Sequence, residues 1–160
     1  MIMNFYTADI CDAKGDEVVV LDPIFKSYGA VTKCYGTIET IKLDEDNTEL
    51  ITLLKTKVEN KIAVVDVSAD YCAVVGENLM NFAYQNGWKA IIINGYVRDI
   101  EATRETEVGL FALGTCPRKS PKKSEAQLDI ELNFASVTFR PNMHLYTDLD
   151  GIIISDKKVH

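Results

Sequence analysis

The stretch from Gly76 to Asp99 most constrains what this chain can fold into, because it joins an amphipathic helix to a buried strand. Apolar residues recur at helical spacing after Gly76, and Gly87 suits the position that follows a helix C-terminus. The β-branched run at residues 89–94 is typical of a buried strand. Because a strand antiparallel to its preceding helix returns the chain to the helix start, we expect Arg98 and Asp99 to lie beside that start.

The N-terminus of a helix can bind an anion, because its first backbone N–H groups have no partner in the helix and the macrodipole is positive there. The Arg98 guanidinium and the metal-capable Asp99 carboxylate would lie beside this anion site. A structural alternative is an ordinary turn at Gly76, with Asp99 as the cap of a helix at residues 100–108. The candidate site residues are Gly76, Glu77, Asn78, Leu79, Arg98 and Asp99.

Five segments of the chain carry a more specific signal. They are TADICDAKGD (Thr7 to Asp16), GENL (Gly76 to Leu79), NGYVRD (Asn94 to Asp99), FALGTCPRKSPKK (Phe111 to Lys123) and VTFRPNMHLYTDLDGIIIS (Val137 to Ser155). With these segments in this order from end to end, the chain resembles the RraA-like family. That family contains the class II 4-hydroxy-4-methyl-2-oxoglutarate aldolases and the regulators of ribonuclease E activity.

The resemblance implies roles for three of the site residues. Aldolase-type members carry an acidic residue, twenty intervening positions and then Arg-Asp, which this chain matches with Glu77, Arg98 and Asp99. By this resemblance Asp99 binds a divalent metal cation, Mg²⁺ or Mn²⁺, and Arg98 binds the oxygens of a small 2-oxo acid substrate. Many members have an acidic residue three positions after that Asp. This chain has Ala102 there and Glu101 one place early, so it departs from the pattern at a position suited to proton transfer.

The expected function is therefore a divalent-metal-dependent lyase. It would cleave 4-hydroxy-4-methyl-2-oxoglutarate to pyruvate by a retro-aldol reaction and decarboxylate oxaloacetate, both through a pyruvate enolate. Backbone N–H groups of residues 76–79 would hold the substrate carboxylate, Arg98 would stabilise the enolate, and Glu77 would position a water or assist proton transfer. The alternative is a non-catalytic regulator that binds and inhibits ribonuclease E. The presence of Asp99, which some regulator-type members lack, favours the enzyme.

The order of expected elements predicts an α/β fold, a layered domain with a mixed sheet. The resemblance makes this a swivelling β/β/α-type domain that assembles as a homotrimer with sites between subunits. Residues 1–160 show no repeat, linker or low-complexity segment, so one domain is expected. The other expected helices are residues 8–13, 47–58 (capped by Asn47 or Thr48) and 101–106. The other expected strands are residues 17–21, 30–40, 61–67, 109–114, 127–133, 137–140 and 151–155.

Composition and charge exclude several classes of protein. A chain of 160 residues with 47% hydrophobic residues can bury a sizeable core, and no apolar run reaches the roughly 18 residues that span a membrane. The start of the chain lacks the basic region of a signal peptide, so we expect a cytoplasmic protein. A net charge of −7 argues against direct nucleic-acid binding, which needs a basic surface.

The dense basic run has three interpretations. It is a solvated loop, a cationic rim that draws a dianionic substrate to the site, or a contact surface for a partner protein. The run consists of Arg118, Lys119, Lys122 and Lys123.

The remaining polar residues give weaker predictions. The four cysteines (Cys11, Cys34, Cys72 and Cys116) have no metal-binding spacing, so we expect free thiols, mostly buried. His144 is expected to be packed, and Asp148 to Gly151 to form a turn between strands. Asp66 at a strand end, with Thr7, Asp9 and Asp12 near the start, stays outside the candidate site.

Overall fold

The computed structural model describes residues 4–44, 46–121 and 125–160 and is built around a mixed sheet of nine strands. The strand order is β1-β14-β13-β3-β4-β6-β8-β2, and β10 also pairs with β3. Neighbours in the run β3-β4-β6-β8 are parallel, whereas the other pairs are antiparallel. The predicted α/β class with a mixed sheet is therefore confirmed. The strands are β1 (Val19–Val20), β2 (Lys26–Ser27), β3 (Cys34–Leu43), β4 (Lys61–Asp66), β6 (Ala90–Asn94), β8 (Gly109–Ala112), β10 (Ala126–Leu128), β13 (His144–Asp148) and β14 (Gly151–Ser155).

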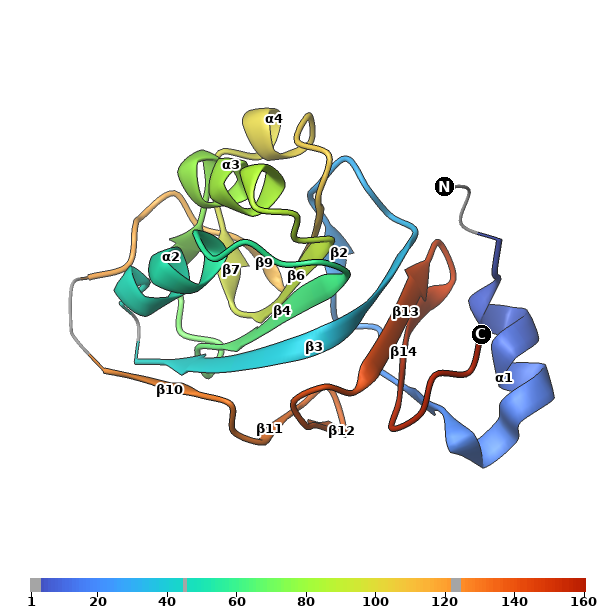
Figure 1. Ribbon diagram of the computed structural model, residues 1–160. Helices are drawn as coiled ribbons and strands as arrows, with labels where there is room; N and C mark the ends of the chain where they lie inside the picture. The colour runs from blue at the N-terminus through green and yellow to red at the C-terminus, as the bar shows by residue number, and fades with distance from the viewer. Residues whose placement is uncertain (1–3, 45, 122–124) are drawn as a thin grey trace.

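Helices and a short hairpin cover the sheet. Figure 1 shows α2, α3 and α4 together over one face, with α1 at the far end beside β13 and β14. The helices are α1 (Thr7–Lys14), α2 (Thr48–Leu54), α3 (Glu77–Gln85) and α4 (Ile100–Thr103), and a 3₁₀ turn, η1 (Gly15–Glu17), follows α1. The hairpin consists of β11 (Leu132–Phe134) and β12 (Val137–Phe139). Among the described residues, no helix is both long and apolar enough to cross a membrane.

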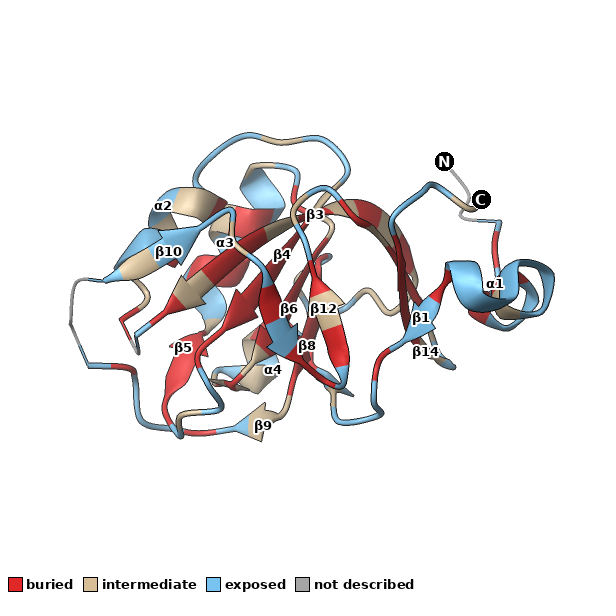
Figure 2. Ribbon diagram, turned by 90° about the horizontal axis from the view of Figure 1, so that it is seen from below, coloured by how far each residue is buried: buried red, intermediate tan, exposed pale blue. Residues whose placement is uncertain are grey.

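The central strands are buried on both faces, which is why their sequences are nearly continuous apolar runs. In β4, Ala63 and Val65 pack into the core beneath the helices, whereas Ile62 and Val64 pack into the core on the hairpin side. Figure 2 shows the buried residues concentrated along β4, β6 and β8. The alternation along β4 thus joins two cores through one strand.

Both edge strands of the large sheet come from one short segment. β1 and β2 form the two ends of the strand order, yet only residues 21–25 separate them in the chain. Five residues span at most about 18 Å, so the sheet must curl until its two ends approach each other. A cavity of about 450 Å³ lies there, between residues of β1, β2, β8 and the β13–β14 hairpin.

A second sheet of three short parallel strands, β5-β7-β9, was not predicted. Each follows a strand of the large sheet after a short connection, and the break between β6 and β7 falls at Gly95. A Cβ atom on Gly95 would lie 2.6 Å from a side-chain carbon of Val67, so the chain passes too closely there for a larger residue. The strands are β5 (Ala73–Val75), β7 (Tyr96–Val97) and β9 (Gly114–Thr115).

Several predicted boundaries are wrong, and two of them have a local reason. The strand expected at residues 127–133 is two strands in different sheets, β10 and β11, because Asp129 between them adopts a left-handed conformation (φ 56°). The strand expected at residues 17–21 starts as the turn η1, so only Val19–Val20 pair with β14. The helices expected at residues 47–58 and 101–106 are the shorter α2 and α4.

The predicted ends of two helices can be compared with the observed caps. Gly87 directly follows the last cap residue of α3 and has a φ of 87°, as the predicted C-terminal glycine requires. Asn47 occupies the N-cap position of α2, but its side chain makes no cap hydrogen bond. The Asp46 carboxylate instead accepts hydrogen bonds from the backbone N–H (2.9 Å) and hydroxyl (2.6 Å) of Thr48.

Candidate active site

The N-terminus of α3 meets the segment that follows β7, as the sequence predicts. The backbone N–H of Glu77, the first helical residue, donates a hydrogen bond of 3.0 Å to Oδ2 of Asp99. A Cβ atom on Gly76 would lie 2.5 Å from the same oxygen, so only glycine leaves room for the carboxylate. The Asp99 side chain therefore caps α3 from 22 residues away.

The backbone of Asp99 has a separate role. Asp99 has a left-handed conformation (φ 63°, ψ 41°) and is the N-cap residue of α4, where its carbonyl accepts hydrogen bonds from Ala102 and Thr103 at 2.9 Å. Its side chain makes no cap hydrogen bond to α4. The structural alternative from the sequence, a cap for the following helix, therefore holds for the backbone of Asp99 and not for its carboxylate.

Both the backbone and the side chain of Arg98 donate hydrogen bonds to the protein. Its backbone N–H donates to the carbonyl of Val75 (3.0 Å), which extends the pairing of β7 with β5. Its Nη1 donates to the carbonyl of Pro117 (3.3 Å) in the loop after β9. The guanidinium of the half-buried Arg98 thus has one donor committed to the protein by an exposed hydrogen bond, and a guanidinium has five donors.

These groups surround one cavity of about 120 Å³, and every predicted site residue lines it. Their roles in binding or catalysis stay a prediction. The cavity walls come from the end of β5 and the start of α3, from the segment after β7, from the start of α2 and from the loop after β9. The lining residues are Asn47, Ala73, Val74, Val75, Gly76, Glu77, Asn78, Leu79, Arg98, Asp99, Lys119 and Ser120.

Three polar members of this lining are not among the predicted site residues. Asn47 was expected only as a helix cap, but its Nδ2 donates to the carbonyl of Val74 (2.8 Å) and ties α2 to β5. Lys119 belongs to the predicted basic run, whereas Ser120 carried no signal. Of the other basic residues, Arg118 is exposed and does not line the cavity. Lys122 and Lys123 lie outside the described residues.

The charges around the cavity balance. Arg98 and Lys119 are formally positive, and Glu77 and Asp99 are formally negative. Among the described residues no group of three or more His, Cys, Asp or Glu side chains is arranged to hold a metal ion. A cation in this cavity would therefore need oxygen ligands from water or substrate besides the two carboxylates.

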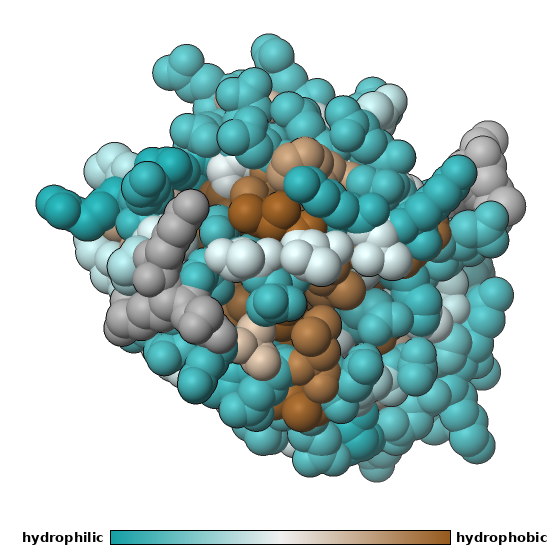
Figure 3. All heavy atoms as spheres, turned by 60° about the vertical axis from the view of Figure 1, so that its left-hand side comes forward, coloured by the Kyte–Doolittle hydropathy of each residue, from teal (hydrophilic) through white to brown (hydrophobic). Residues whose placement is uncertain are grey.

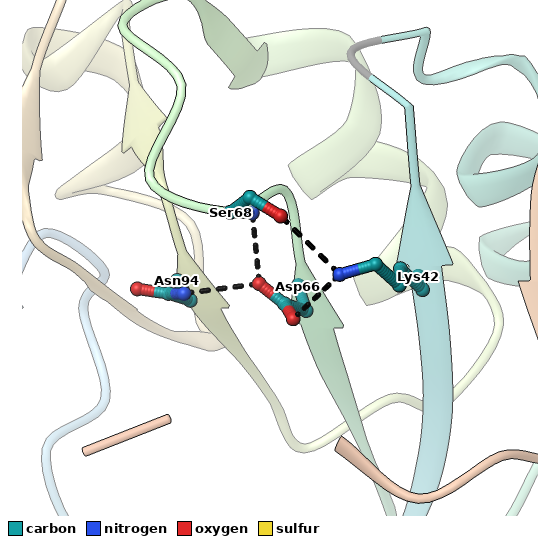
Figure 4. Close-up of polar contacts among 4 residues, drawn as sticks. All are labelled: Lys42, Asp66, Ser68 and Asn94. Carbon is teal, nitrogen blue, oxygen red and sulfur yellow. Dashed lines mark hydrogen bonds and ion pairs between the residues drawn. The ribbon is translucent and has the colours of Figure 1, made fainter. Parts of the chain in front are cut away.

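Asp66, which stayed outside the candidate site, is part of a different polar cluster (Figure 4). Its buried carboxylate accepts hydrogen bonds from Lys42 Nζ (3.1 Å), the backbone N–H of Ser68 (2.8 Å) and Asn94 Nδ2 (2.9 Å). Lys42, Asp66 and Asn94 belong to the neighbouring strands β3, β4 and β6. The cluster therefore ties the ends of three parallel strands together, and Asp66 serves as a structural residue.

Two of the other polar candidates, Thr7 and His144, also have structural partners. Thr7 donates two hydrogen bonds to the carboxylate of Asp148, from its backbone N–H (2.7 Å) and its hydroxyl (2.6 Å), which joins α1 to the predicted turn between β13 and β14. His144 Nδ1 lies 2.7 Å from the Tyr35 hydroxyl, and the two rings stack. Asp9 lies in the first turn of α1, where a negative charge stabilises the helix.

No disulfide joins the four cysteines, all of which lie among the described residues. Cys34, Cys72 and Cys116 are buried, and Cys11 is partly exposed. Burial raises the pKa of the Cys34 thiol to about 12, so this group stays protonated and unreactive at neutral pH.

Comparisons with known proteins match this chain over nearly its whole length. A family model described as "RraA-like: Aldolase/RraA" matches residues 7–154. A relative from Aromatoleum aromaticum is 39% identical over 158 residues, which cover 98% of this chain and 99% of the relative. A relative from Bacillus anthracis is 37% identical and covers 96% of this chain and 98% of its own. Both carry the name "Putative 4-hydroxy-4-methyl-2-oxoglutarate aldolase".

Two solved structures share the fold closely. One is described as an S-adenosylmethionine:2-dimethylmenaquinone methyltransferase from Geobacillus kaustophilus, with a TM-score of 0.93, 33% identity and coverage of 97% of each chain. The other is described as the RNA-processing inhibitor RraA from Thermus thermophilis. It has a TM-score of 0.92 and 31% identity and covers 97% of this chain and 94% of its own.

Proposed function

Because this chain belongs to the RraA-like family, we propose that it is a divalent-metal-dependent lyase. Its substrates would be small 2-oxo acids: 4-hydroxy-4-methyl-2-oxoglutarate, cleaved to pyruvate by a retro-aldol reaction, and oxaloacetate, which loses carbon dioxide. The names of the relatives support aldolase activity. One observation of this molecule carries the proposal, namely that Arg98, Asp99 and the N-terminus of α3 line the same small cavity.

The size of the cavity favours a small acid over a large cofactor. Pockets for drug-sized ligands and cofactors are roughly 300–1,000 Å³, whereas this cavity is about 120 Å³. A ligand as large as S-adenosylmethionine, which the name of one structural relative contains, does not match that volume. A short 2-oxo acid does.

The donor set fits a hard divalent cation of the Mg²⁺ or Mn²⁺ type. Oδ2 of Asp99 is held by Glu77, and its Oδ1 makes no hydrogen bond to the described residues, so Asp99 would bind the cation through Oδ1. The exposed Glu77 carboxylate lines the same cavity and would hold a water of the cation's shell. Mg²⁺ sites commonly use one or two carboxylates, with water and substrate as the other ligands. When bound, the cation would polarise the 2-oxo group as a Lewis acid.

The start of α3 would bind the substrate carboxylate next to the 2-oxo group. The N–H groups of Asn78 and Leu79 lie in the first turn of the helix and have no partner within it. The N–H of Glu77 is already engaged by Asp99. The N–H groups of Asn78 and Leu79 and the helix dipole therefore remain for the substrate, whereas the sequence alone assigned it the N–H groups of residues 76–79.

Arg98 would stabilise the charge that develops during bond cleavage. In the retro-aldol reaction the C3–C4 bond breaks, its electron pair forms the pyruvate enolate, and the C4 hydroxyl loses its proton. Decarboxylation of oxaloacetate gives the same enolate without that deprotonation. The guanidinium is preorganised by the Pro117 carbonyl, so it can bind the enolate oxygen without first being ordered. Glu77 would accept the hydroxyl proton through a water. Ala102 has no acidic group that could assist this proton transfer.

The test compares decarboxylation of oxaloacetate by protein with Mg²⁺ or Mn²⁺ against metal alone, because the free ions also catalyse this reaction. We expect the protein to add a rate that EDTA abolishes and that fresh metal restores. Folded protein with no rate above the metal control would overturn the enzyme proposal.

A second candidate function is a regulator that binds and inhibits ribonuclease E. The observation in its favour is the 31% identity to the structure described as an RNA-processing inhibitor. Purified chain added to a ribonuclease E cleavage assay tests it, with the Asp99→Asn variant alongside. Inhibition by both proteins would indicate a binding function that does not need the catalytic site, whereas no inhibition at micromolar protein would exclude this function.

The proposed assembly is a homotrimer, which the family resemblance implies. Light scattering on the purified chain measures this directly. A mass of three chains supports sites that draw on two subunits, whereas a fully active monomer would restrict each site to one chain.

A further inference from the structure

We infer that Lys119 is a specificity-determining residue that binds the second carboxylate of the substrate, the one farther from the 2-oxo group. The inference rests on the proposed function and deepens it, because it names the residue that would select dicarboxylic over monocarboxylic 2-oxo acids. Lys119 lines the cavity together with Arg98 and the start of α3. The α3 N-terminus and Arg98 would engage the 2-oxo acid end, which leaves the ammonium group for the other end.

The backbone of Lys119 is fixed against the cavity wall. Ala73 in β5 donates its N–H to the carbonyl of Arg118 (2.7 Å) and accepts from the N–H of Ser120 (2.9 Å). These two bonds make a parallel bridge between Ala73 and Lys119, which places Lys119 at the edge of the small sheet. The loop is therefore held by one isolated parallel bridge at the residue that lines the cavity.

Arg98 is hydrogen-bonded to the loop that carries Lys119. The guanidinium of Arg98 donates to the carbonyl of Pro117, two residues before Lys119. The same loop is thus bound by β5 through its backbone and by Arg98 through a side chain. The backbone of Lys119 and the side chain of Arg98 are thus attached to the same loop, so the two cations face the cavity from fixed attachment points.

The ammonium group of Lys119 is available for a ligand. None of the described carboxylates forms an ion pair with it, whereas Lys42, Lys61 and Arg140 each have an acidic partner. The face of the molecule drawn in Figure 3 is mostly hydrophilic, with apolar side chains gathered near its middle. An exposed cation at the mouth of a small polar cavity suits a free carboxylate better than an apolar partner.

Arg118 provides a matched control. It is the neighbouring cation on the same loop, it is exposed, and it does not line the cavity. Lys119→Gln and Arg118→Gln each remove one positive charge at nearly the same place. General electrostatic attraction of an anion would weaken equally in both variants, whereas a direct contact would be lost only in Lys119→Gln.

The experiment uses two retro-aldol substrates that differ only in the second carboxylate: 4-hydroxy-4-methyl-2-oxoglutarate and 4-hydroxy-2-oxopentanoate. We expect Lys119→Gln to lower kcat/KM for the dicarboxylate by roughly tenfold to a hundredfold, as the loss of one charge-assisted hydrogen bond does. The monocarboxylate should change by no more than about twofold, Arg118→Gln should leave the ratio of the two substrates as in the wild type, and Lys119→Arg should restore most of the dicarboxylate rate. An equal loss on both substrates would overturn the inference.

A binding measurement separates this inference from failure of the proposed function. Calorimetry with 2-oxoglutarate and 2-oxobutyrate, which again differ only in the second carboxylate, needs no turnover. The wild type should bind 2-oxoglutarate more tightly, and Lys119→Gln should remove that preference. A chain that turns over neither aldol substrate but shows this pattern would keep the Lys119 site and lose the lyase. If wild type and Lys119→Gln bind the two acids alike, Lys119 does not recognise the second carboxylate.

Discussion

The carboxylate of Asp99 caps α3 through the backbone N–H of Glu77 at 3.0 Å. One side chain therefore orders the start of the helix that would bind the substrate, and in the proposed function its second oxygen would bind a cation. Because the two functions share one carboxylate, a substitution at Asp99 can be chosen that keeps the first and removes the second.

Asp99→Asn is that substitution. An amide oxygen can still accept the hydrogen bond from Glu77, so the thermal midpoint of unfolding should change little. A neutral amide is a poor ligand for a hard cation, so metal-dependent decarboxylation of oxaloacetate should fall to the rate of metal alone. A variant that keeps metal-dependent turnover would show that Asp99 is only a helix cap.

Arg98→Lys tests whether the planar guanidinium is needed. A lysine keeps the charge but cannot bind two oxygens side by side while also reaching the Pro117 carbonyl. We expect kcat to fall roughly a hundredfold, about 3 kcal/mol of barrier. Arg140→Lys is the control, since Arg140 is an exposed residue paired with Asp156, and its activity should match the wild type. Near-full activity of Arg98→Lys would show that the guanidinium of Arg98 is not needed and that the active site lies elsewhere.

Gly76→Ala tests the fit between the glycine and the carboxylate. The new methyl group would lie 2.5 Å from Oδ2 of Asp99, so the carboxylate must leave the N–H of Glu77. The backbone of Gly76 is extended, so the substitution adds no conformational strain of its own. We expect a loss of metal-dependent activity with a moderate fall in thermal stability. A crystal structure of the variant with the Asp99–Glu77 contact intact would contradict this account.

Ala102→Glu tests the departure from the family pattern. The new carboxylate would stand three positions after Asp99, and the proton transfer that only the retro-aldol reaction requires should become faster. We expect the ratio of aldol cleavage to decarboxylation to rise. Glu101→Ala, which alters the neighbouring position, should leave the ratio unchanged. A ratio that stays constant in Ala102→Glu would show that the position does not contribute to proton transfer.

The stability of the fold should depend on pH through His144. Partial burial, and to a lesser extent the nearby Lys158, lower the pKa of His144 below its usual 6.5, so the folded state disfavours the charged form. The unfolded chain then binds more protons, and stability falls as pH drops through 6.5 towards the lowered value. His144→Gln should flatten this part of the curve in thermal melts, and His160→Gln should not. Equal curves for His144→Gln and the wild type would exclude His144 as the cause.

A second group acts at lower pH. Hydrogen bonds from Thr7 hold the pKa of Asp148 below its usual 3.8 despite partial burial. Its contribution to stability is complete above pH 3.8 and is lost as pH falls through the lowered value, so it does not overlap the window of His144.

The sequence predicts the helix and the strand that carry the site better than the small sheet that joins them. The helix α3 has apolar residues at helical spacing and the strand β6 is a continuous apolar run, so the return of Arg98 and Asp99 to the helix start follows from their lengths. The strands β5, β7 and β9 have two or three residues each and carry no periodic signal, and their pairing depends on the large sheet beside them. Since Lys119 reaches the cavity through that pairing, its place could not be read from the basic run alone.

Asp129 illustrates the same limit on the scale of one residue. The apolar and polar residues at 127–133 suit a single strand, yet a left-handed turn at one aspartate divides them between two sheets. Aspartate tolerates that conformation better than most residues, but it does not require it.

The segment that supplies both edges of the large sheet couples regions that lie at opposite ends of the strand order. Detachment of residues 19–27 would strip the outer strand from β14 and from β8 in a single event. Amide protons on both sides should then exchange with solvent at correlated rates, as members of one cooperative opening unit, although most of the sheet separates them. Residues 19–27 thus hold the curled sheet at both of its ends, and the two ends would open together.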